Sequence, residues 1–350
     1  MTLLEYGQAY AMKIKMKIVW IVLNTTLVAL LVAVLIWLAH TPPSSSGVEA
    51  GSVGGSGSRE APLRIGLIPE RDIFKQNKRY RALADYLSLR LDRPVQLVTL
   101  RTYEDALHEL ADEEIDAAFL GSFVAVLAMD RLGAKVTVKP ESIDGTSTYH
   151  GVLFVRDDSP IRRLEHLRGR SIGMVRTTTA GQVFAGCVIM HLKLWNTPDE
   201  PEVVWAGTHD DVVEMVVKGG VDAGAVKNLR LEAVMRAHPD WKIRTLAAGT
   251  DVPNNALLLR RGVSPNLRAR ITKILLEMVD DPQGRETLTV MEAKRFLPCR
   301  PQEYVAIYNM VDCIQSAWKE IGVSDPPPQR PSDWPAPDPE DVAKCYDVNY

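Results

Sequence analysis

The body of this chain alternates short apolar segments with longer amphipathic ones, and this alternation restricts the fold more than any other feature. Residues 63–68 form an apolar segment ending at Pro69, and residues 80–91 then carry apolar side chains at helical spacing. Further strands are predicted at residues 95–100, 115–120, 149–155, 171–175, 203–205, 223–226, 243–246 and 256–259. Helices are predicted between and after them, at residues 103–111, 180–194, 209–218, 266–279, 284–290 and 301–320. This order predicts an α/β protein with largely parallel sheets covered on both faces.

The pattern restarts near residue 149, which indicates two α/β units of similar size. We expect residues 61–148 and 247–322 to form lobe 1 and residues 149–246 to form lobe 2. Ligands of open α/β sheets bind outside the carboxyl ends of the strands. The predicted binding site is therefore a cleft between the lobes.

An apolar run at residues 18–39 carries no charge and is long enough to span a bilayer as a helix. Lys13, Lys15 and Lys17 precede it, which predicts a cytoplasmic N-terminus and an exported body. We interpret residues 1–40 as a retained signal anchor. The alternative is a signal peptide cleaved after about residue 39, which would leave a soluble periplasmic protein.

Two further segments have few apolar side chains that could be buried in a core. Residues 41–60 are rich in Pro, Gly and Ser and are predicted to be a flexible linker. Residues 323–350 contain the run PPPQRPSDWPAPDP and are interpreted as a surface-hugging or disordered C-terminal tail, because proline cannot continue a helix or a central strand.

The bulk charge and the cysteines exclude several classes of function. A net charge of -3 gives no broad positive field, so we expect no nucleic-acid partner. The four cysteines show no CxxC or Cys/His metal spacing, and neither a metal nor a cofactor is predicted. One or two disulfides are expected outside the cytoplasm, but three complete pairings are open. The cysteines are Cys187, Cys299, Cys313 and Cys345.

Four segments rich in small or hydroxyl residues stand at strand ends. They are GSF with Ser122, GTSTYHG with Tyr149, TTTAG at residues 177–181 and AGTHDD at residues 206–211. Such segments combine backbone N–H groups at a helix start with side-chain donors, and this combination suits a tetrahedral oxyanion.

TTTAG is the most suggestive of the four. Thr178 and Thr179 have hydroxyls to donate, the N–H groups of Ala180 and Gly181 open the helix, and Gly181 would let the backbone approach a ligand closely. The alternative is that the threonines only cap this helix.

AGTHDD combines a capping box with a histidine. Thr208 is the predicted N-cap with Asp211 three residues on. His209 begins the helix, where it would donate to an anion as a neutral ring or pair with it as a cation. Asp210 and Asp211 would repel a dianion unless they face away.

Other polar residues near strand ends are weaker candidates. Tyr149, on the predicted hinge strand, is expected to enter the cleft or to pack the lobes together. Lys227, after the strand at residues 223–226, would supply a positive charge or remain solvated. Arg71 and Lys75 follow the first strand and have the same two alternatives.

Taken together, several segments resemble the phosphate/phosphite/phosphonate-type substrate-binding proteins of ABC transporters. The segments are GTSTYHGVLFVRDDSPI, LEHLRGRSIGMV, TTTAG, AGTHDDVVEMVVKGGVDAGAVKN and DVPNNALLLRRG, in the order typical of that family. The resemblance covers residues 62–315 and implies a two-lobed, type II-like periplasmic binding protein fold with two crossover strands.

The resemblance also implies a set of ligand contacts. A Ser/Thr-rich helix start corresponds to Thr178, Thr179 and Ala180, a histidine to His209 and a cleft tyrosine to Tyr149. Three positions depart from the family pattern: Ala180 replaces a hydroxyl residue, Ser122 replaces a proline and Gln182 replaces an aromatic residue. These departures affect the choice among phosphate, phosphite and phosphonate.

The predicted function is an extracytoplasmic solute-binding protein that captures a phosphorus oxyanion for an ABC transporter permease. A ligand-binding sensory subunit of a membrane kinase is the second hypothesis, because the same cleft serves both tasks. A hydrolytic enzyme is the third and least favoured, since the sequence has no GxSxG turn, P-loop or HExxH motif. The expected location is the periplasm, anchored to the inner membrane through residues 18–39.

Overall fold

The computed structural model describes residues 60–70, 73–315, 327–331 and 346–347. The predicted anchor at residues 18–39, the linker up to residue 59 and Cys345 lie outside these residues. Within the described part, no helix has the length and hydropathy of a membrane span.

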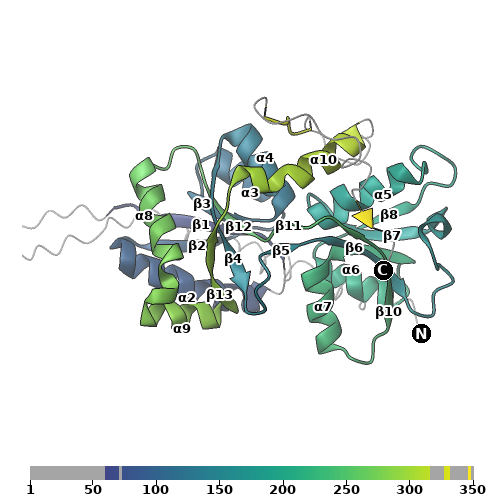
Figure 1. Ribbon diagram of the computed structural model, residues 1–350, viewed down its shortest axis with the longest axis horizontal. Coiled ribbons are helices and arrows are strands. Elements are labelled where there is room, and N and C mark those ends of the chain that lie inside the picture. Colours follow the sequence, from purple (N-terminus) through teal and green to yellow (C-terminus); the bar gives the residue numbers. More distant parts are fainter. Residues whose placement is uncertain (1–59, 71–72, 316–326, 332–345, 348–350) are drawn as a thin grey trace, which may run out of the picture. The chain divides into compact units, whose positions relative to one another are not determined.

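Six strands form the first sheet, in the order β13-β4-β12-β3-β1-β2 (Figure 1). Strand β1 runs parallel to β2 and β3, whereas β12, β4 and β13 are joined by antiparallel pairing. The bounds are β1 (Leu63–Leu67), β2 (Val95–Thr99), β3 (Ala117–Leu120), β4 (Lys135–Ser142), β12 (Ala256–Leu259) and β13 (Ala293–Pro298).

The second sheet has the order β14-β10-β6-β9-β7-β8. Strand β7 runs parallel to β8 and β9, and the remaining pairs are antiparallel. The bounds are β6 (Gly151–Arg156), β7 (Ser171–Val175), β8 (Glu202–Ala206), β9 (Ala223–Lys227), β10 (Ile243–Gly249) and β14 (Tyr346–Asp347).

A two-stranded ladder lies where the chain passes between the two sheets. Strand β5 (Thr148–Tyr149) pairs antiparallel with β11 (Val252–Pro253), with Tyr149 opposite Val252. The chain enters the second sheet after β5 and returns to the first through β11. This ladder confirms the two crossover strands that the family resemblance implied and places Tyr149 on the hinge.

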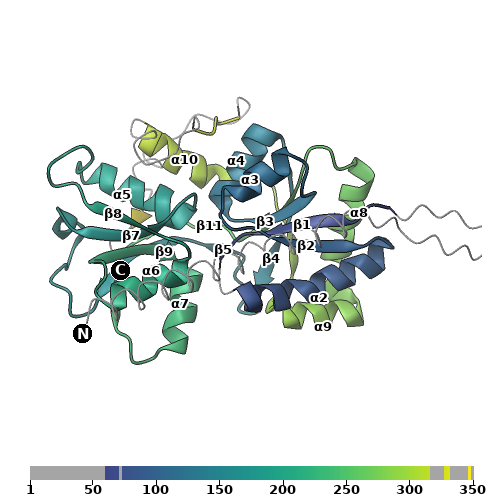
Figure 2. The same cartoon turned by 180° about the vertical axis from the view of Figure 1, so that it is seen from behind.

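Helices cover both faces of each sheet, as the alternation predicted (Figures 1 and 2). Leu257 and Leu259 of β12 face one core, while Ala256 and Leu258 face the other, as expected for a strand buried on both sides. The helices of the first sheet are α2 (Ile73–Leu91), α3 (Asp105–Ala111), α4 (Ser122–Leu132), α8 (Pro265–Leu276), η3 (Met278–Asp280) and α9 (Pro282–Val290). Those of the second are η1 (Leu164–Leu167), η2 (Thr179–Phe184), α5 (Ala185–His191), α6 (His209–Val217) and α7 (Asn228–Ala237).

Helix α10 (Val305–Ile314), which follows η4 (Pro301–Tyr304), contacts elements of both lobes. It packs against α4 beside the first sheet and against η2 and α5 beside the second. One hydrophobic core therefore continues from the α3 and α4 face of the first sheet, through Ile307 and Val311, into the second lobe.

The prediction of largely parallel sheets is wrong for half of each sheet. Strands β4 and β13 were not predicted, because KVTVKPES and AKRFLP mix charged residues and proline with apolar ones, which weakens the strand pattern. Helix α4 was also missed, since its first seven residues are all buried and so show no amphipathic period. The predicted strand at residues 149–155 is interrupted at His150, which separates β5 from β6.

Of the cysteines, the structure describes Cys187, Cys299 and Cys313, and no disulfide joins these three to one another. The Cys187 thiol donates to the carbonyl of Met310 at 3.2 Å. Burial raises the pKa of the Cys299 thiol to about 11, which keeps it protonated.

Two described pieces of the C-terminal tail contact the body. Arg330 donates to Asn309 at 2.6 Å and to Asp312 at 2.9 Å, both on α10. Strand β14 pairs with β10 at the edge of the second sheet. These pieces agree with the surface-hugging alternative for the tail.

The turn between β7 and η2 has an unusual backbone. Thr177 has φ of 55°, a left-handed conformation that is rare for a β-branched residue. Its N–H donates to Gln182 Oε1 at 2.6 Å, and its hydroxyl donates to the Glu104 carboxylate. The side chain of Gln182, at a position where the family often has an aromatic residue, therefore stabilises this turn.

Gly181 has a different role from the one expected. A Cβ at Gly181 would lie 2.5 Å from the carbonyl oxygen of Val175 and 2.7 Å from the Thr178 hydroxyl. The absent side chain thus allows η2 to pack on the end of β7, which explains the glycine without a ligand, and the close approach of the Gly181 backbone to a ligand stays a prediction.

We expect Gly181→Ala to lower the free energy of unfolding by about 1–3 kcal/mol, because the added methyl overlaps backbone atoms. Gly186→Ala is the matched control, since its Cβ would be 3.5 Å from the nearest atom and alanine favours the helix. Urea unfolding of both variants measures the difference. Equal stability of the two variants would contradict this account of the turn.

Candidate anion-binding site

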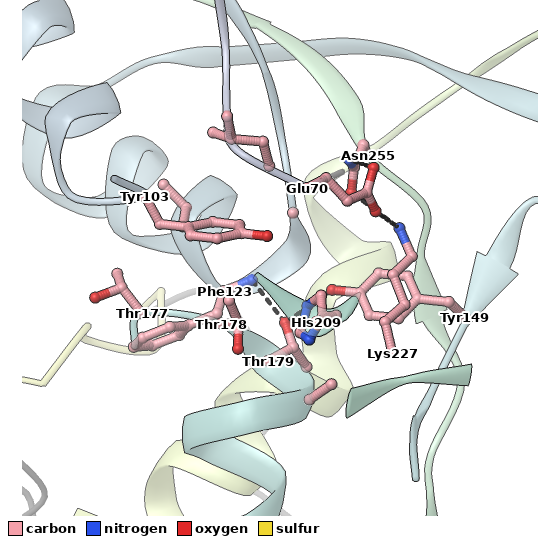
Figure 3. A pocket seen from close by; sticks show the side chains of 14 residues that line it. Glu70, Tyr103, Phe123, Tyr149, Thr177, Thr178, Thr179, His209, Lys227 and Asn255 are labelled. Atoms are coloured by element: carbon pink, nitrogen blue, oxygen red, sulfur yellow. Dashed lines mark hydrogen bonds and ion pairs between the residues drawn. The ribbon is translucent and has the colours of Figure 1, made fainter. Parts of the chain in front are cut away.

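A small cavity of about 10 Å³ lies between the carboxyl ends of strands from both sheets (Figure 3). This volume corresponds to about one water molecule, so side chains nearly fill the cavity in this arrangement of the lobes. The lining comprises Ile68, Glu70, Tyr103, Gly121, Phe123, Val124, Tyr149, Thr177, Thr178, Thr179, Ala180, His209, Lys227 and Asn255.

Three helices begin at this cavity. The starts of α4, η2 and α6 contribute Phe123, Thr179 and His209 to its lining. The first N–H groups of a helix have no carbonyl one turn before them, and the helix dipole is positive at this end. Converging helix starts therefore favour a bound anion without a net positive charge.

The hydroxyl of Thr179 joins the two lobes at the cavity. Its oxygen accepts a hydrogen bond from the N–H of Phe123 at 2.9 Å and another from the Tyr149 hydroxyl at 3.0 Å. A hydroxyl has two acceptor positions and one proton, so the proton of Thr179 remains for donation.

Thr178 lines the cavity, but its hydroxyl serves the helix. The Thr178 hydroxyl donates to the carbonyl of Val175 at 2.9 Å and accepts from the N–H of Gly181 at 3.0 Å. This is an N-cap, the alternative that the sequence left open. The neighbouring Ala180 has no side-chain donor and contributes its backbone to the lining.

Ser122 lies beside the cavity and is not part of its lining. The Ser122 hydroxyl donates to the carbonyl of Pro253 at 2.6 Å, and the N–H of Ser122 donates to the Tyr149 hydroxyl at 3.3 Å. Ser122 thus attaches the start of α4 to both strands of the hinge ladder.

His209 is buried at the start of α6, and its Nδ1 has no hydrogen-bond partner among the described residues. Burial is the largest cause that lowers the pKa of His209 to about 3; Lys227 and Arg230 lower it further, against the opposing effect of Glu70. The ring is therefore neutral at physiological pH. An unpartnered nitrogen in a cavity is costly unless a ligand satisfies it.

Tyr103, which the sequence analysis placed only at a helix start, presents a second unpartnered polar atom. Its hydroxyl is buried without a hydrogen-bond partner in the described structure and points into the cavity (Figure 3). Burial raises the pKa of Tyr103 well above its usual range, so the hydroxyl keeps its proton and remains a donor.

The two charged residues of the lining form an ion pair. Lys227 Nζ is 2.5 Å from Glu70 Oε1 and 3.2 Å from Asn255 Oδ1, and it lies 4.3 Å from the centre of the Tyr149 ring. Glu70 Oε2 accepts from Asn255 Nδ2 at 3.0 Å. The solvated alternative for Lys227 is therefore wrong, and its charge is balanced inside the cavity.

The two acidic residues after His209 are accounted for without a ligand. Asp211 completes the predicted capping box with Thr208. Asp210 binds Arg230 through two of its guanidinium nitrogens, at 2.6–3.0 Å. The side chains of Arg71 and Lys75 lie outside the described part of the chain.

The structure thus brings six of the seven predicted site residues to one cavity and leaves Ser122 beside it. Sequence reasoning missed Glu70, Tyr103 and Asn255. Each follows or precedes a strand of the first sheet, at the carboxyl ends of β1 and β2 and just before β12. Their position near strand ends was the available signal.

We expect Thr178→Ala to cost about 1 kcal/mol of stability, the usual effect of losing a helix cap. Thr178→Ser keeps the hydroxyl and should retain most of that stability. Urea unfolding of the two variants tests the assignment. A serine variant as unstable as the alanine variant would refute the capping role.

His209 should make the ligand-free protein less stable in acid. Its folded pKa of about 3 lies below the ordinary value of 6.5, so the unfolded chain binds a proton that the folded protein does not. This contribution is absent above about pH 6.5 and costs up to about 1.4 kcal/mol per pH unit as the pH falls toward 3.

His209→Gln removes this titration, so the variant should gain stability relative to the parent as the pH falls from 6.5 to 4.5. Denaturant unfolding at several pH values measures the difference. His108→Gln, at an exposed position on α3, is the control and should follow the parent. Parallel curves for the parent and His209→Gln would argue against a buried neutral imidazole.

Comparison with known proteins agrees with this geometry. The family model described as "ABC transporter, phosphonate, periplasmic substrate-binding protein" matches residues 65–304. A probable ABC transporter phosphite-binding protein of Prochlorococcus marinus is 22% identical over 265 residues, which cover 69% of this chain and 86% of that protein. The phosphonates-binding periplasmic protein of Escherichia coli is 19% identical over 237 residues, covering 66% and 70%.

The fold agrees as well. The solved structure of the Prochlorococcus protein in complex with methylphosphonate aligns with a TM-score of 0.62 at 17% identity, covering 72% of this chain and 97% of that one. This similarity shows the two-lobed periplasmic binding protein fold. Because the family model spans more than half of the sequence, this chain belongs to the phosphonate-type periplasmic substrate-binding proteins of ABC transporters.

Proposed function

We propose that this chain captures a small phosphorus oxyanion in the cavity between its lobes and delivers it to an ABC transporter permease. The observation that carries the proposal is the pair of buried polar atoms, Tyr103 Oη and His209 Nδ1, without partners in the described structure. Both belong to the cavity at which three helices begin. An oxyanion would accept from both and from the helix starts.

The names of the relatives support a ligand whose central atom is phosphorus. The curated relatives are named for phosphite and phosphonates, and the solved relative holds methylphosphonate. The proposed contacts in this chain are Tyr103, the Thr179 hydroxyl, the N–H groups at the start of η2, and His209. Tyr149 would act through Thr179, and Thr178 through the helix that it caps.

Binding without turnover fits the arrangement better than hydrolysis. The two aspartates that follow His209 are engaged by Arg230 and by the helix cap, so neither orients the imidazole as a base. The Thr178 hydroxyl is engaged as a cap as well. We therefore propose that the ligand leaves chemically unchanged, which ³¹P NMR of the recovered ligand would test.

The proposal includes the location of the protein and the residue limits of its two lobes. Family membership implies an extracytoplasmic body, and we propose that residues 18–39 anchor it to the inner membrane. We propose lobe 1 at residues 61–148 and 247–322 and lobe 2 at residues 149–246, which the membership of the two main sheets supports up to β13, except that β10 of the second sheet continues to Gly249. Strand β14 adds residues 346–347 to the second sheet.

We expect Tyr103→Phe and His209→Ala each to weaken oxyanion binding at least about tenfold. Each removes a hydrogen bond to a charged group, which contributes about 1.5–3 kcal/mol, and about 1.4 kcal/mol corresponds to tenfold in affinity. Calorimetry with phosphate, phosphite and methylphosphonate at pH 6 measures the change.

Tyr308→Phe is the matched control, because Tyr308 is buried on α10 outside the cavity lining. It should bind as the parent does, and near-ultraviolet circular dichroism should show all three variants folded. Parent-like affinity of both cavity variants would remove the basis for the assigned site. Failure of the parent to bind any of the three anions would overturn the proposed ligand class.

A further inference from the structure

Each of the three N–H donors of Lys227 has a hydrogen-bond acceptor within the protein. Its ammonium group has three N–H donors, and three oxygens lie within reach: Glu70 Oε1 at 2.5 Å, Asn254 Oδ1 at 2.8 Å and Asn255 Oδ1 at 3.2 Å. The side chain is 5% exposed. Lys227 would have to give up one of these oxygens to donate to a bound anion, so it is better placed to hold its neighbours than to hold a ligand.

The residue that Lys227 holds is Glu70, and Glu70 lines the cavity. Lys227 fixes one carboxylate oxygen and the amide of Asn255 fixes the other, so the group has a defined orientation at the cavity wall (Figure 3). A carboxylate only accepts hydrogen bonds. An unprotonated ligand oxygen against Glu70 would meet like charge, whereas an O–H group would donate to it.

Other groups of the lining are hydrogen-bond donors. The Tyr103 hydroxyl, the Thr179 hydroxyl and the helix starts suit ligand oxygens that carry no proton. His209 also lines the cavity, and its Nδ1 is available as a neutral ring nitrogen. The cavity therefore offers hydrogen-bond donors to most oxygens of a tetrahedral anion and a hydrogen-bond acceptor to the remaining oxygen.

This asymmetry, taken with the proposed function on which it rests, points to the protonation state of the ligand. We propose that Glu70 determines specificity by accepting a hydrogen bond from the P–OH group of a monoprotonated oxyanion, with Lys227 and Asn255 as positioning residues. The site then takes the monoanion of a phosphonate or phosphite and rejects tetrahedral dianions without a proton, such as sulfate.

Four groups that interact electrostatically with Glu70 do not titrate in the range where such a ligand does. Tyr103, Tyr149, His209 and Arg230 each interact electrostatically with Glu70, and Lys227 is paired with it. The pKa of His209 is about 3, and the pKa values of the two tyrosines and of Arg230 are raised. A change of affinity between about pH 6 and 9 would therefore report the ligand.

Calorimetry of the full-length chain with methylphosphonate from pH 6 to 9 tests the proposal. If only the monoanion binds, affinity falls about tenfold per pH unit above the second pKa of the ligand. In that range, binding should take up about one proton per ligand, measured from the heat in buffers of different ionisation enthalpy. Sulfate should bind at least about a hundredfold more weakly than methylphosphonate at pH 6.

Glu70→Gln keeps the shape of the side chain, removes the negative charge and leaves that of Lys227. The variant should lose most of the pH slope and the proton uptake, and its affinity for sulfate should rise at least about tenfold. Glu214→Gln, at an exposed carboxylate paired with Lys218, is the control and should keep the parent profile.

The outcomes separate the two proposals. Tight binding of methylphosphonate by the parent with equal affinity at pH 6 and 9, or a slope unchanged in Glu70→Gln, overturns the role of Glu70 and leaves the proposed function standing. No binding of methylphosphonate, phosphite or phosphate by the parent at pH 6 overturns the proposed function, and the role of Glu70 with it.

Discussion

The Thr179 hydroxyl is the point where the hinge, the first lobe and the second lobe meet. It accepts one hydrogen bond from the start of α4 and one from Tyr149 of β5, while its own residue begins η2. Two helix starts are thereby held against each other across the cavity. Neutral donors can bind an anion only if they converge in this way, because no net charge draws the ligand in. Gly181, the Thr178 cap and the Gln182 contact to Thr177 all keep η2 in the position that this junction requires.

The cavity is close to electrically neutral, and this decides how it can recognise an anion. Its charged residues, Glu70 and Lys227, neutralise each other, and Arg230 nearby is paired with Asp210. Recognition then depends on the direction of hydrogen bonds more than on net charge, so it distinguishes ligands by the position of their protons. A buried ion pair costs desolvation energy and contributes little to stability by itself. The position of the Glu70–Lys227 pair at the wall of a binding cavity is better explained by its effect on which ligands bind.

The sequence predicted the parts of the fold and site that local patterns determine. Nine predicted strands are present, and Thr178, Thr179, Ala180 and His209 were found because each lies in a helix-start motif that can be read within a few residues. Strands β4 and β13 were missed because their sequences mix charged residues and proline with apolar ones, which weakens the strand pattern. Glu70, Tyr103 and Asn255 were missed for another reason. They come from three separate loops, and only the pairing of β1, β2, β3 and β12 brings those loops to one place. Whether a hydroxyl caps a helix or faces a ligand is likewise a question of direction, and Thr178 and Thr179 differ in this respect although they are neighbours.

The contacts between the lobes also determine how a ligand enters. Polar contacts between the lobes at or near the cavity include Phe123 to Thr179, Glu104 to Thr177, and Lys227 to Glu70, Asn254 and Asn255. Water can replace each of these contacts, so separating them costs about 0.5–1.5 kcal/mol for a neutral hydrogen bond and about 1.5–3 kcal/mol where one group is charged. The β5–β11 ladder and α10 are different, because the ladder is continuous backbone and α10 buries apolar side chains against elements of both lobes. Opening should therefore break the polar contacts and bend the chain near the ladder while α10 stays packed on one lobe. A ligand that bridges Tyr103 and His209 adds contacts present only in the closed arrangement, and this difference in binding energy is what favours closure.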